Sequence, residues 1–396
     1  MNEPFYPLAS TTWDKSEYDA LERVIKTGNF TMGLEVRKFE EQFAAKMGSK
    51  YAVMTNSGSS ANLALMAAAR YVKDSTLCDG DSIIAPAVSW STTYYPIHQL
   101  GFSLSLVDID KETLNIDVNK VIEAITPRTK AIFAVNLLGN PSDLNQIREI
   151  AQAKNLLLFE DNCESLGATL DSKQAGTFGL AGTYSSFFSH HISTMEGGLT
   201  VTDDLAFYQT MKSIRAHGWT RDLPPENFVH NKSGDEWDDL FRFVLPGYNL
   251  RPLELEGALG QTQLIKLDGF IKNRRINASI LQGEASRFPH IKLQKENGKS
   301  SWFGFSLVLD GPLEGKRSQL VAALTEAGIQ SRPIVTGNFA QNPVMKHLRH
   351  DPLPQLKNAC YIHLNGLFVG NHHYPMSAQI ERLVEVLEKF EGNHVK

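Results

Sequence analysis

The sequence predicts an α/β protein with a large, mostly parallel β-sheet and a smaller α+β region near the C-terminus. Short apolar runs rich in β-branched and aromatic residues recur between helical patterns over roughly the first half of the chain. Such alternation is typical of parallel strands joined by helices. The chain of 396 residues is long enough for two hydrophobic cores. We therefore expect a large domain over residues 1–250 and a smaller domain over residues 251–396.

Seven apolar runs are the predicted strands of the large domain. In chain order they are YAVM at residue 51, SIIA at 82, LSLVD at 104, AIFAVN at 131, LLLFED at 156, YSSFF at 184 and LTVTD at 199. The segment TNSGSSANLALMAAARY after the first run is typical of a helix that begins with small residues. Because ligands bind at the carboxyl ends of parallel strands, we expect the functional site there.

The second half of the chain has a different pattern. Residues 215–247 are polar and irregular and exceed a typical loop in length, which predicts a lid or an interface segment. Beyond them we expect a long helix over residues 252–285, a strand over 301–310, a helix over 316–328 and an amphipathic helix over 377–391.

The composition excludes several classes of protein. A net charge of −5 disfavours non-specific nucleic-acid binding, because such surfaces are usually basic. No apolar run reaches the roughly 18 residues of a membrane span, and MNEPFYPLASTTW lacks the pattern of a signal peptide. We therefore expect a cytoplasmic protein with no membrane association. Cys78, Cys163 and Cys360 lie far apart in the sequence, which indicates reduced thiols.

The segment SGSS predicts a phosphate site. Ser57, Gly58 and Ser59 lie at the expected start of a helix, where free backbone N–H groups and hydroxyls bind anions. An ordinary helix N-cap would give the same pattern. Ser185, at the expected end of a distant strand, is a second candidate phosphate hydroxyl, although a lone serine there is often only packed.

Two further residues are candidates for binding a planar, charged ring. Asp161 ends a very apolar strand, where a carboxylate needs a cation or a donor such as a protonated ring nitrogen. The alternative is an exposed acid at the strand end. Trp90, in PAVSWSTTYYP, is either a stacking platform for such a ring or a core residue.

Two adjacent histidines, His190 and His191, precede the turn MEGG. Neighbouring side chains in extended or turn backbone diverge, so only one of them can face a given site, and we expect no metal site. The glycines of the turn allow close approach of the backbone to a ligand. His372 and His373 repeat the pattern near the C-terminus, and we expect them to be solvent-exposed or rim residues.

Together these segments resemble the nucleotide-sugar aminotransferases, pyridoxal-phosphate enzymes with the aspartate aminotransferase fold (fold type I), over essentially the whole chain. The resemblance implies pyridoxal or pyridoxamine 5′-phosphate as cofactor and a homodimer whose subunits share active sites. In LPGYNLRPLE, an asparagine and an arginine are expected to reach the neighbouring subunit's site. The implied cofactor-binding residues are Ser57, Gly58, Ser59, Trp90, Asp161, Glu164, Ser185, Asn249 and Arg251.

His190 departs from the pattern of this family. The family's covalently bound lysine lies six residues before the glutamate of EGG, and in this sequence that position is His190. Imidazole cannot hold the cofactor covalently, but it is an effective base. The substitution resembles the family's 3-dehydratase branch, which removes a sugar hydroxyl. The resemblance implies that His190 is catalytic, that the substrate is a GDP-linked sugar and that L-glutamate is the amino donor.

Several alternatives stay open on the sequence. A related branch with the same histidine uses an iron–sulfur cluster, which usually needs four thiolates. Three scattered cysteines lead us to expect no cluster. An aminotransferase would need another lysine, and Lys173 and Lys212 do not fit the spacing. The remaining alternatives are a 3-dehydratase that acts on another nucleotide-linked 4-keto-6-deoxyhexose, and an inactive relative that only binds cofactor or sugar nucleotide.

Overall fold

The central element of the computed structural model, which describes residues 4–395, is a seven-stranded sheet. Its strand order is β1-β9-β8-β5-β4-β2-β3. All strands except β9 run in the same direction, and β9 is antiparallel to both β1 and β8. The strands are β1 (Tyr51–Thr55), β2 (Ser82–Pro86), β3 (Ser103–Val107), β4 (Thr129–Val135), β5 (Leu157–Asp161), β8 (Ala181–Ser185) and β9 (Gly198–Thr202).

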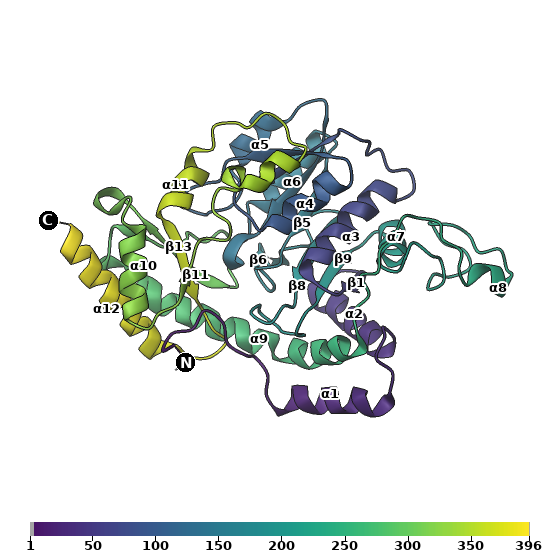
Figure 1. Ribbon diagram of the computed structural model, residues 1–396, viewed down its shortest axis with the longest axis horizontal. Helices are drawn as coiled ribbons and strands as arrows, with labels where there is room; N and C mark the ends of the chain where they lie inside the picture. Colours follow the sequence, from purple (N-terminus) through teal and green to yellow (C-terminus); the bar gives the residue numbers. More distant parts are fainter. Residues whose placement is uncertain (1–3, 396) are drawn as a thin grey trace.

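Helices cover both faces of this sheet (Figure 1). Neighbouring strand residues point to opposite faces: Ile83 packs in the core under α3, α4 and α7, whereas Ile84 packs in the core under α5 and α6. The helices that follow the strands are α3 (Gly58–Tyr71), α4 (Ser91–Gln99), α5 (Val118–Ala124), α6 (Leu144–Ala153) and α7 (Leu205–Arg215). This arrangement confirms the predicted mostly parallel sheet. Within residues 4–395, no helix has the length and apolar character that crossing a membrane requires.

The bounds predicted for the sixth strand, the run YSSFF at residue 184, are partly wrong. The strand β8 ends at Ser185, so Ser186, Phe187 and Phe188 of the run YSSFF belong to the following loop. The two phenylalanines are exposed. The true strand instead contains Gly182, where a Cβ atom would lie 2.0 Å from the carbonyl oxygen of Gly176. Its small residues pack closely against neighbouring backbone, and the sequence pattern does not show this.

A long helix, α9 (Glu254–Gly283), connects this sheet to a second sheet of four strands, ordered β10-β11-β13-β12. The first half of α9 packs on α1 (Lys15–Thr27) and α2 (Leu34–Met47). The second sheet packs on α10 and α12 around a separate core. Its elements are β10 (Ile291–Lys292), β11 (Gly304–Leu309), α10 (Arg317–Glu326), β12 (Ser331–Arg332), α11 (Lys357–Asn365), β13 (Gly366–Gly370) and α12 (Ser377–His394). These helices confirm the expected C-terminal pattern; the domain boundary at residue 250 stays a prediction.

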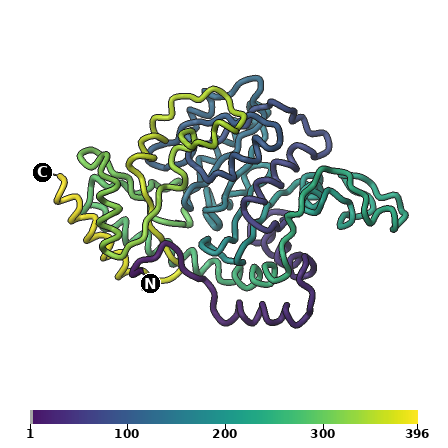
Figure 2. The backbone as a smooth tube through the Cα atoms, in the orientation of Figure 1, coloured from purple at the N-terminus to yellow at the C-terminus, as the bar shows by residue number. Residues whose placement is uncertain are grey.

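From residue 4 onward, the N-terminal segment runs along the second sheet before it reaches α1 (Figures 1 and 2). The Tyr6 hydroxyl donates to the carbonyl oxygen of Gly370 at 2.5 Å. His372 is buried between the Ser10 hydroxyl and the carbonyl oxygen of Pro7. The expectation that His372 is a solvent or rim residue is therefore wrong, because the N-terminal segment covers it.

The segment between α7 and α9 extends away from the rest of the molecule and includes the short helix α8 (Glu236–Asp239) (Figures 1 and 2). It exposes four aromatic side chains, Phe228, Trp237, Phe241 and Phe243, and Trp237 is 82% exposed. This segment corresponds to the irregular residues 215–247 of the sequence.

Two glycines of α9 allow a direct test of the packing between α9 and α2. A Cβ atom on Gly257 would lie 2.5 Å from the backbone nitrogen of Val36, whereas one on Gly269 would meet no atom within 4 Å. We expect Gly257→Ala to destabilise the fold by about 1–3 kcal/mol, because α2 must move. The matched control Gly269→Ala should stabilise it by about 0.5–1 kcal/mol, because alanine favours helix. Urea unfolding measures both, and equal stabilities would contradict the close contact.

Candidate active site

A cavity of about 350 Å³ lies at the carboxyl ends of β1, β2, β4, β5 and β8. Parallel strands converge on this edge, where the sequence predicted the site. Asn249 and Arg251 do not line this cavity; the Arg251 Nε donates to the Asn249 Oδ1 at 3.0 Å, and Asn249 is exposed. The predicted residues that line the cavity are Ser57, Gly58, Ser59, Trp90, Asp161, Glu164, Ser185 and His190.

The start of α3 forms a polar cradle against the end of β8. Ser57 is the N-cap of α3, and its hydroxyl accepts a hydrogen bond from the Ser60 backbone N–H at 3.0 Å. A Cβ atom on Gly58 would lie 2.7 Å from the Ser185 Cβ, so only glycine permits this approach. The helix N-terminus and the hydroxyls of Ser57, Ser59 and Ser185 line one end of the cavity. This arrangement suits a phosphate group.

Asp161 is 5% exposed and accepts three hydrogen bonds. The donors are the Asn62 Nδ2 at 2.8 Å, the Thr93 hydroxyl at 2.7 Å and the Cys163 backbone N–H at 3.1 Å. The Thr183 hydroxyl donates to the Asn62 Oδ1 at 2.6 Å, which orients the amide so that its NH₂ faces Asp161. The three donors fix the carboxylate in the cavity wall, where it can bind a protonated ring nitrogen. The alternative of an exposed acid is wrong.

Glu160, which precedes Asp161 on β5, points to the other face of the sheet. It is buried and accepts hydrogen bonds from the backbone N–H groups of Gly176, Phe178 and Gly179. These contacts hold the hairpin of β6 (Thr169–Leu170) and β7 (Lys173–Gln174) and the turn after it. Of the two adjacent acids, only Asp161 therefore serves the cavity.

Glu164 lies beside Asp161 in the cavity wall, where its carboxylate accepts a hydrogen bond from the Leu138 backbone N–H at 3.0 Å. Burial raises the pKa of Glu164 to about 7, and the nearby Asp161 charge acts in the same direction. The carboxyl group therefore exists in both protonation states near neutral pH. It can donate to, or accept from, an oxygen of a bound ring.

His190 lies in the loop between β8 and β9, and its Nδ1 is 2.9 Å from the carbonyl oxygen of Cys163. A carbonyl oxygen only accepts, so Nδ1 carries the proton and Nε2 keeps its lone pair. Burial lowers the pKa of His190 to about 4, although the contact with Cys163 opposes this shift. The Phe303 ring packs against the imidazole, with centroids 5.1 Å apart. The structure thus holds a neutral imidazole whose basic nitrogen is Nε2.

Two more side chains complete the wall. Trp90 immediately precedes α4 and is 58% exposed, which excludes the alternative that it is a core residue. Its indole is available to stack on a ring. Arg332, on β12, contributes a cationic side chain from the second sheet. A carboxylate or phosphate of a bound molecule can pair with its guanidinium.

Sequence reasoning missed Asn62, Thr93 and Arg332. Asn62 lies one helical turn after Gly58, and Thr93 lies three residues after Trp90, so their positions near predicted residues are the only signal for them. Arg332 comes from the second sheet, and no local pattern connects it to the strand ends of the first.

These residues fit pyridoxal or pyridoxamine 5′-phosphate. The cavity offers a phosphate cradle that only glycine at position 58 permits, a buried carboxylate held by three donors, and an aromatic platform. None of the described residues that line it is a lysine. Lys173 and Lys212, considered above as alternatives, lie outside its wall.

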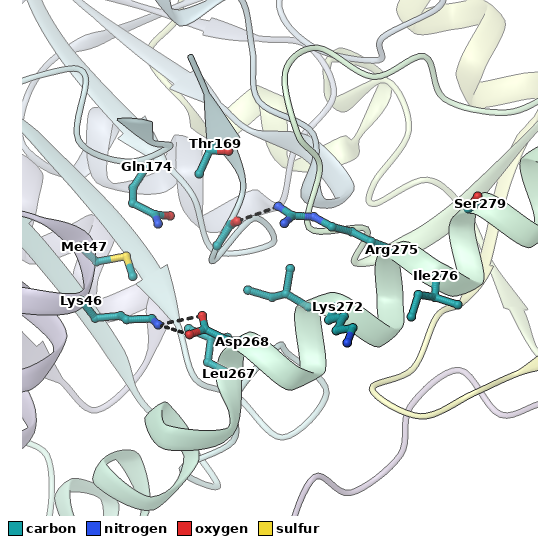
Figure 3. Close-up of a pocket in the computed structure, with 12 residues that line it drawn as sticks. Lys46, Met47, Thr169, Gln174, Leu267, Asp268, Lys272, Arg275, Ile276 and Ser279 are labelled. Carbon is teal, nitrogen blue, oxygen red and sulfur yellow. Dashed lines mark hydrogen bonds and ion pairs between the residues drawn. The ribbon is translucent and has the colours of Figure 1, made fainter. Parts of the chain in front are cut away.

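A second cavity, of about 560 Å³, lies between α2, α9 and the β6–β7 hairpin (Figure 3). Three of its charged side chains, Lys46, Asp268 and Arg275, have partners. The Lys46 Nζ is 2.7 Å from the Asp268 carboxylate, and the Arg275 guanidinium donates to the carbonyl oxygen of Gly167 (Figure 3). It also donates to the carbonyl oxygen of Ser300. Although this cavity is larger, it lacks the convergent titratable groups of the site around His190.

Comparisons with known proteins agree with this geometry. The DegT/DnrJ/EryC1/StrS aminotransferase family matches residues 11–388, and the chain belongs to this family. The chain is 53% identical to GDP-4-keto-6-deoxy-D-mannose 3-dehydratase of Yersinia pseudotuberculosis over 386 residues, which are 97% of this chain and 98% of that protein. Its identity to the protein of the same name from Escherichia coli O55:H7 is 52%, over 97% of this chain and 99% of that protein.

Solved structures of relatives have the same fold. The structure of E. coli GDP-4-keto-6-deoxy-D-mannose-3-dehydratase with bound hydrated PLP has a TM-score of 0.95 at 52% identity, and covers 98% of this chain and 100% of that one. Helicobacter pylori PseC, an aminotransferase, has a TM-score of 0.86 at 22% identity and covers 98% of this chain and 99% of that one. These matches confirm the predicted aminotransferase fold.

The depressed pKa of His190 leads to a measurable prediction. We expect the imidazole in the cofactor-free protein to titrate near pH 4, well below the usual value of about 6.5. Between these two pH values the unfolded chain binds the additional proton, so this group makes the fold less stable as the pH falls. NMR of ring-labelled histidine measures the titration, and the signal missing from His190→Asn assigns it. A midpoint at or above 6.5 would contradict the buried, neutral imidazole.

Proposed function

We propose that the protein is a pyridoxamine-phosphate-dependent 3-dehydratase. Its substrate is GDP-4-keto-6-deoxy-D-mannose, its product is GDP-4-keto-3,6-dideoxy-D-mannose, and L-glutamate restores the cofactor. The product lies on the route to GDP-L-colitose for O-antigen. The observation that carries this proposal is His190, which occupies the family's lysine position beside Asp161 in a cavity whose described wall contains no lysine. Identities of 52–53% to two proteins named for this reaction support it.

Two of the alternatives, an ordinary aminotransferase and a 3-dehydratase for another nucleotide sugar, receive less support. An ordinary aminotransferase needs a lysine in the cavity wall, and the described wall has none. A 3-dehydratase for a sugar on another nucleotide is the second alternative. The relative named dTDP-4-dehydro-2,6-dideoxy-D-glucose 3-dehydratase, from Saccharopolyspora spinosa, is 32% identical to this chain, against 53% for the GDP-sugar enzyme. This difference favours the GDP-linked substrate.

The cofactor is held by three parts of the cavity. Ser57, Gly58, Ser59 and Ser185 bind its phosphate, Asp161 binds its ring nitrogen, and Trp90 stacks on its ring. When bound, pyridoxamine phosphate supplies an amine that joins the sugar ketone and a conjugated ring that carries electrons toward the departing C3 hydroxyl. Glu164, with a pKa of about 7, is placed to bind a ring oxygen.

His190 moves the proton. Its Nε2 is unprotonated at neutral pH, since burial lowers the pKa of the imidazole and the Cys163 carbonyl fixes the proton on Nδ1. Nε2 therefore accepts a proton as the reaction begins and, once protonated, donates it to the C3 hydroxyl as that group leaves as water. One imidazole thus serves first as base and then as acid. A lysine whose amine is bound covalently to the cofactor in the resting enzyme cannot take both roles.

The overall reaction balances with glutamate as reductant. The sugar loses its C3 oxygen as water and gains two electrons, while glutamate is oxidised to 2-oxoglutarate and its nitrogen leaves as ammonia. The sugar half of the cycle releases water with the C3 oxygen and consumes water when ammonia leaves, and the glutamate half takes up no net water, so the complete reaction neither forms nor consumes water. Arg332 offers a cation in the cavity wall, and pairs with a glutamate carboxylate or with a phosphate of the nucleotide.

The proposal includes a homodimer with shared active sites. Asn249 and Arg251 lie outside their own protomer's cavity, as expected if they serve the neighbour's. The segment between α7 and α9 exposes four aromatic side chains on an extension from the molecule (Figure 1). Burial of these side chains against a second copy would remove them from water.

Substitutions of His190 test the reaction directly. His190→Asn should abolish deoxygenation, because an amide has no basic nitrogen near neutral pH, while folding and cofactor binding survive. His190→Lys should restore a covalent bond to the cofactor and divert the sugar toward amination at C4. Mass spectrometry of the nucleotide sugars, together with release of 2-oxoglutarate, measures both outcomes. Full deoxygenation by His190→Asn would show that the base is another residue. The neighbouring His191 lies outside the described cavity wall, with its Nε2 against the Ser301 carbonyl oxygen.

Mixed dimers test the shared site. An Asn249→Ala chain and a His190→Asn chain should each be nearly inactive alone. When they are combined, one of the two sites contains both wild-type residues, so part of the activity should return. Differently tagged chains allow purification of the heterodimer before the assay. A purified heterodimer without activity would contradict the proposed crossing of Asn249.

A further inference from the structure

The loop that carries His190 is held partly by its own hydrogen bonds. The Ser186 backbone N–H donates to the Gly197 carbonyl at 2.9 Å, and the Phe188 N–H donates to the Met195 carbonyl at 3.0 Å. These contacts continue the pairing of β8 and β9 for a short distance. They leave the centre of the loop, residues 189–193, without ladder bonds to a neighbouring strand.

Both main-chain groups of Ser193, in this central part, are held from outside the loop. Its backbone N–H donates to the Gln263 Oε1 at 3.0 Å, and its carbonyl oxygen accepts from the Trp13 Nε1 at 3.0 Å. Ser193 is 1% exposed and lies three residues after His190. The position of the loop is therefore set by α9 on one side and by the N-terminal segment on the other.

Gln263 uses its full hydrogen-bonding capacity at this junction. Its Oε1 accepts from the Ser193 N–H and from the Thr12 hydroxyl at 2.6 Å. Its Nε2 donates to the Thr12 carbonyl at 3.2 Å and to the Glu17 carboxylate at 2.8 Å. The side chain is fully buried. Removal of this amide would leave several buried groups without partners, a costly state.

We propose that Gln263 and Trp13 are positioning residues for His190. They fix the peptide groups of Ser193 and so place the imidazole where its Nε2 accepts the proton. The proposal rests on the proposed function, in which His190 is the base. It assigns the N-terminal segment a part in the reaction, although none of the segment's described residues, from 4 onward, lines the cavity.

The two hydrogen bonds from Gln263 and Trp13 to the main chain of Ser193 form what we call the Ser193 clamp. The chemistry gives a reason for this clamp. A histidine has only two side-chain torsions, so the position of its ring follows the backbone closely. It has no covalent bond to the cofactor that would hold it in place. Displacement by roughly an ångström is enough to slow a proton transfer about a hundredfold. Fixing the position of the loop therefore matters more for the rate of proton transfer in this site than in one whose base is a long lysine bound to the cofactor.

The experiment compares two glutamines of the same helix in the complete enzyme. Gln263→Met removes the clamp with little change in side-chain size. The matched control is Gln261→Met, which removes hydrogen bonds from α9 to Glu35 of α2 instead. Trp13→Phe removes the second contact of the clamp and serves if Gln263→Met does not fold. Hydrogen exchange of the peptide that contains Ser193, and steady-state kinetics, are measured for each variant.

We expect Gln263→Met and Trp13→Phe to exchange faster at this peptide and to lose about tenfold or more in kcat. The KM values and the affinity for pyridoxamine phosphate should change less than about twofold, since the clamp touches neither ligand. Gln261→Met should show neither effect. Unchanged exchange, unchanged kcat, or an equal kcat loss in Gln261→Met would each overturn the inference. Full activity of His190→Asn would instead overturn the proposed function.

Discussion

The start of α3, the end of β8 and the start of β9 lie so close together that Gly58 and Gly198 cannot carry side chains. The geometry of the site depends on this contact. A Cβ atom on Gly58 would lie 2.7 Å from the Ser185 Cβ, and one on Gly198 would lie 2.2 Å from the Ser57 carbonyl oxygen. The cause is β9, which runs antiparallel between β1 and β8 and begins against the start of α3. The hydroxyls after β1 and at the end of β8 can therefore line one concave surface.

The end of β5 and the turn after it position both the Asp161 carboxylate and the His190 imidazole. Asp161 ends the strand and accepts three hydrogen bonds. Two residues later, the Cys163 carbonyl oxygen accepts from the Nδ1 of His190, and burial keeps that imidazole neutral. One short turn thus places both a hydrogen-bonded carboxylate and a neutral imidazole base at the cavity.

Much of the fold and of the cavity could be predicted from local patterns. The apolar runs identified the large sheet. His190, six residues before the glutamate of EGG where the family has its lysine, indicated the chemistry. Asn62 and Thr93 escaped prediction, because their role depends on contacts with Asp161 from elements 99 and 68 residues away. The β8 strand was misplaced because its small residues pack on backbone, a property that hydrophobicity does not reveal. His372 was misjudged because the N-terminal segment covers it.

The sequence by itself determined the strands of the large sheet and the main helices of the second half of the chain, the residues at the strand ends and the replacement of lysine by histidine. These features are local, since each depends on residues within a few positions along the chain. Only the tertiary structure decided which nitrogen of His190 is basic, which of Glu160 and Asp161 faces the cavity, and that Gln263 and Trp13 hold the loop of the base. Each of these depends on one hydrogen bond or on the face of a strand, and such contacts join segments that the sequence keeps far apart.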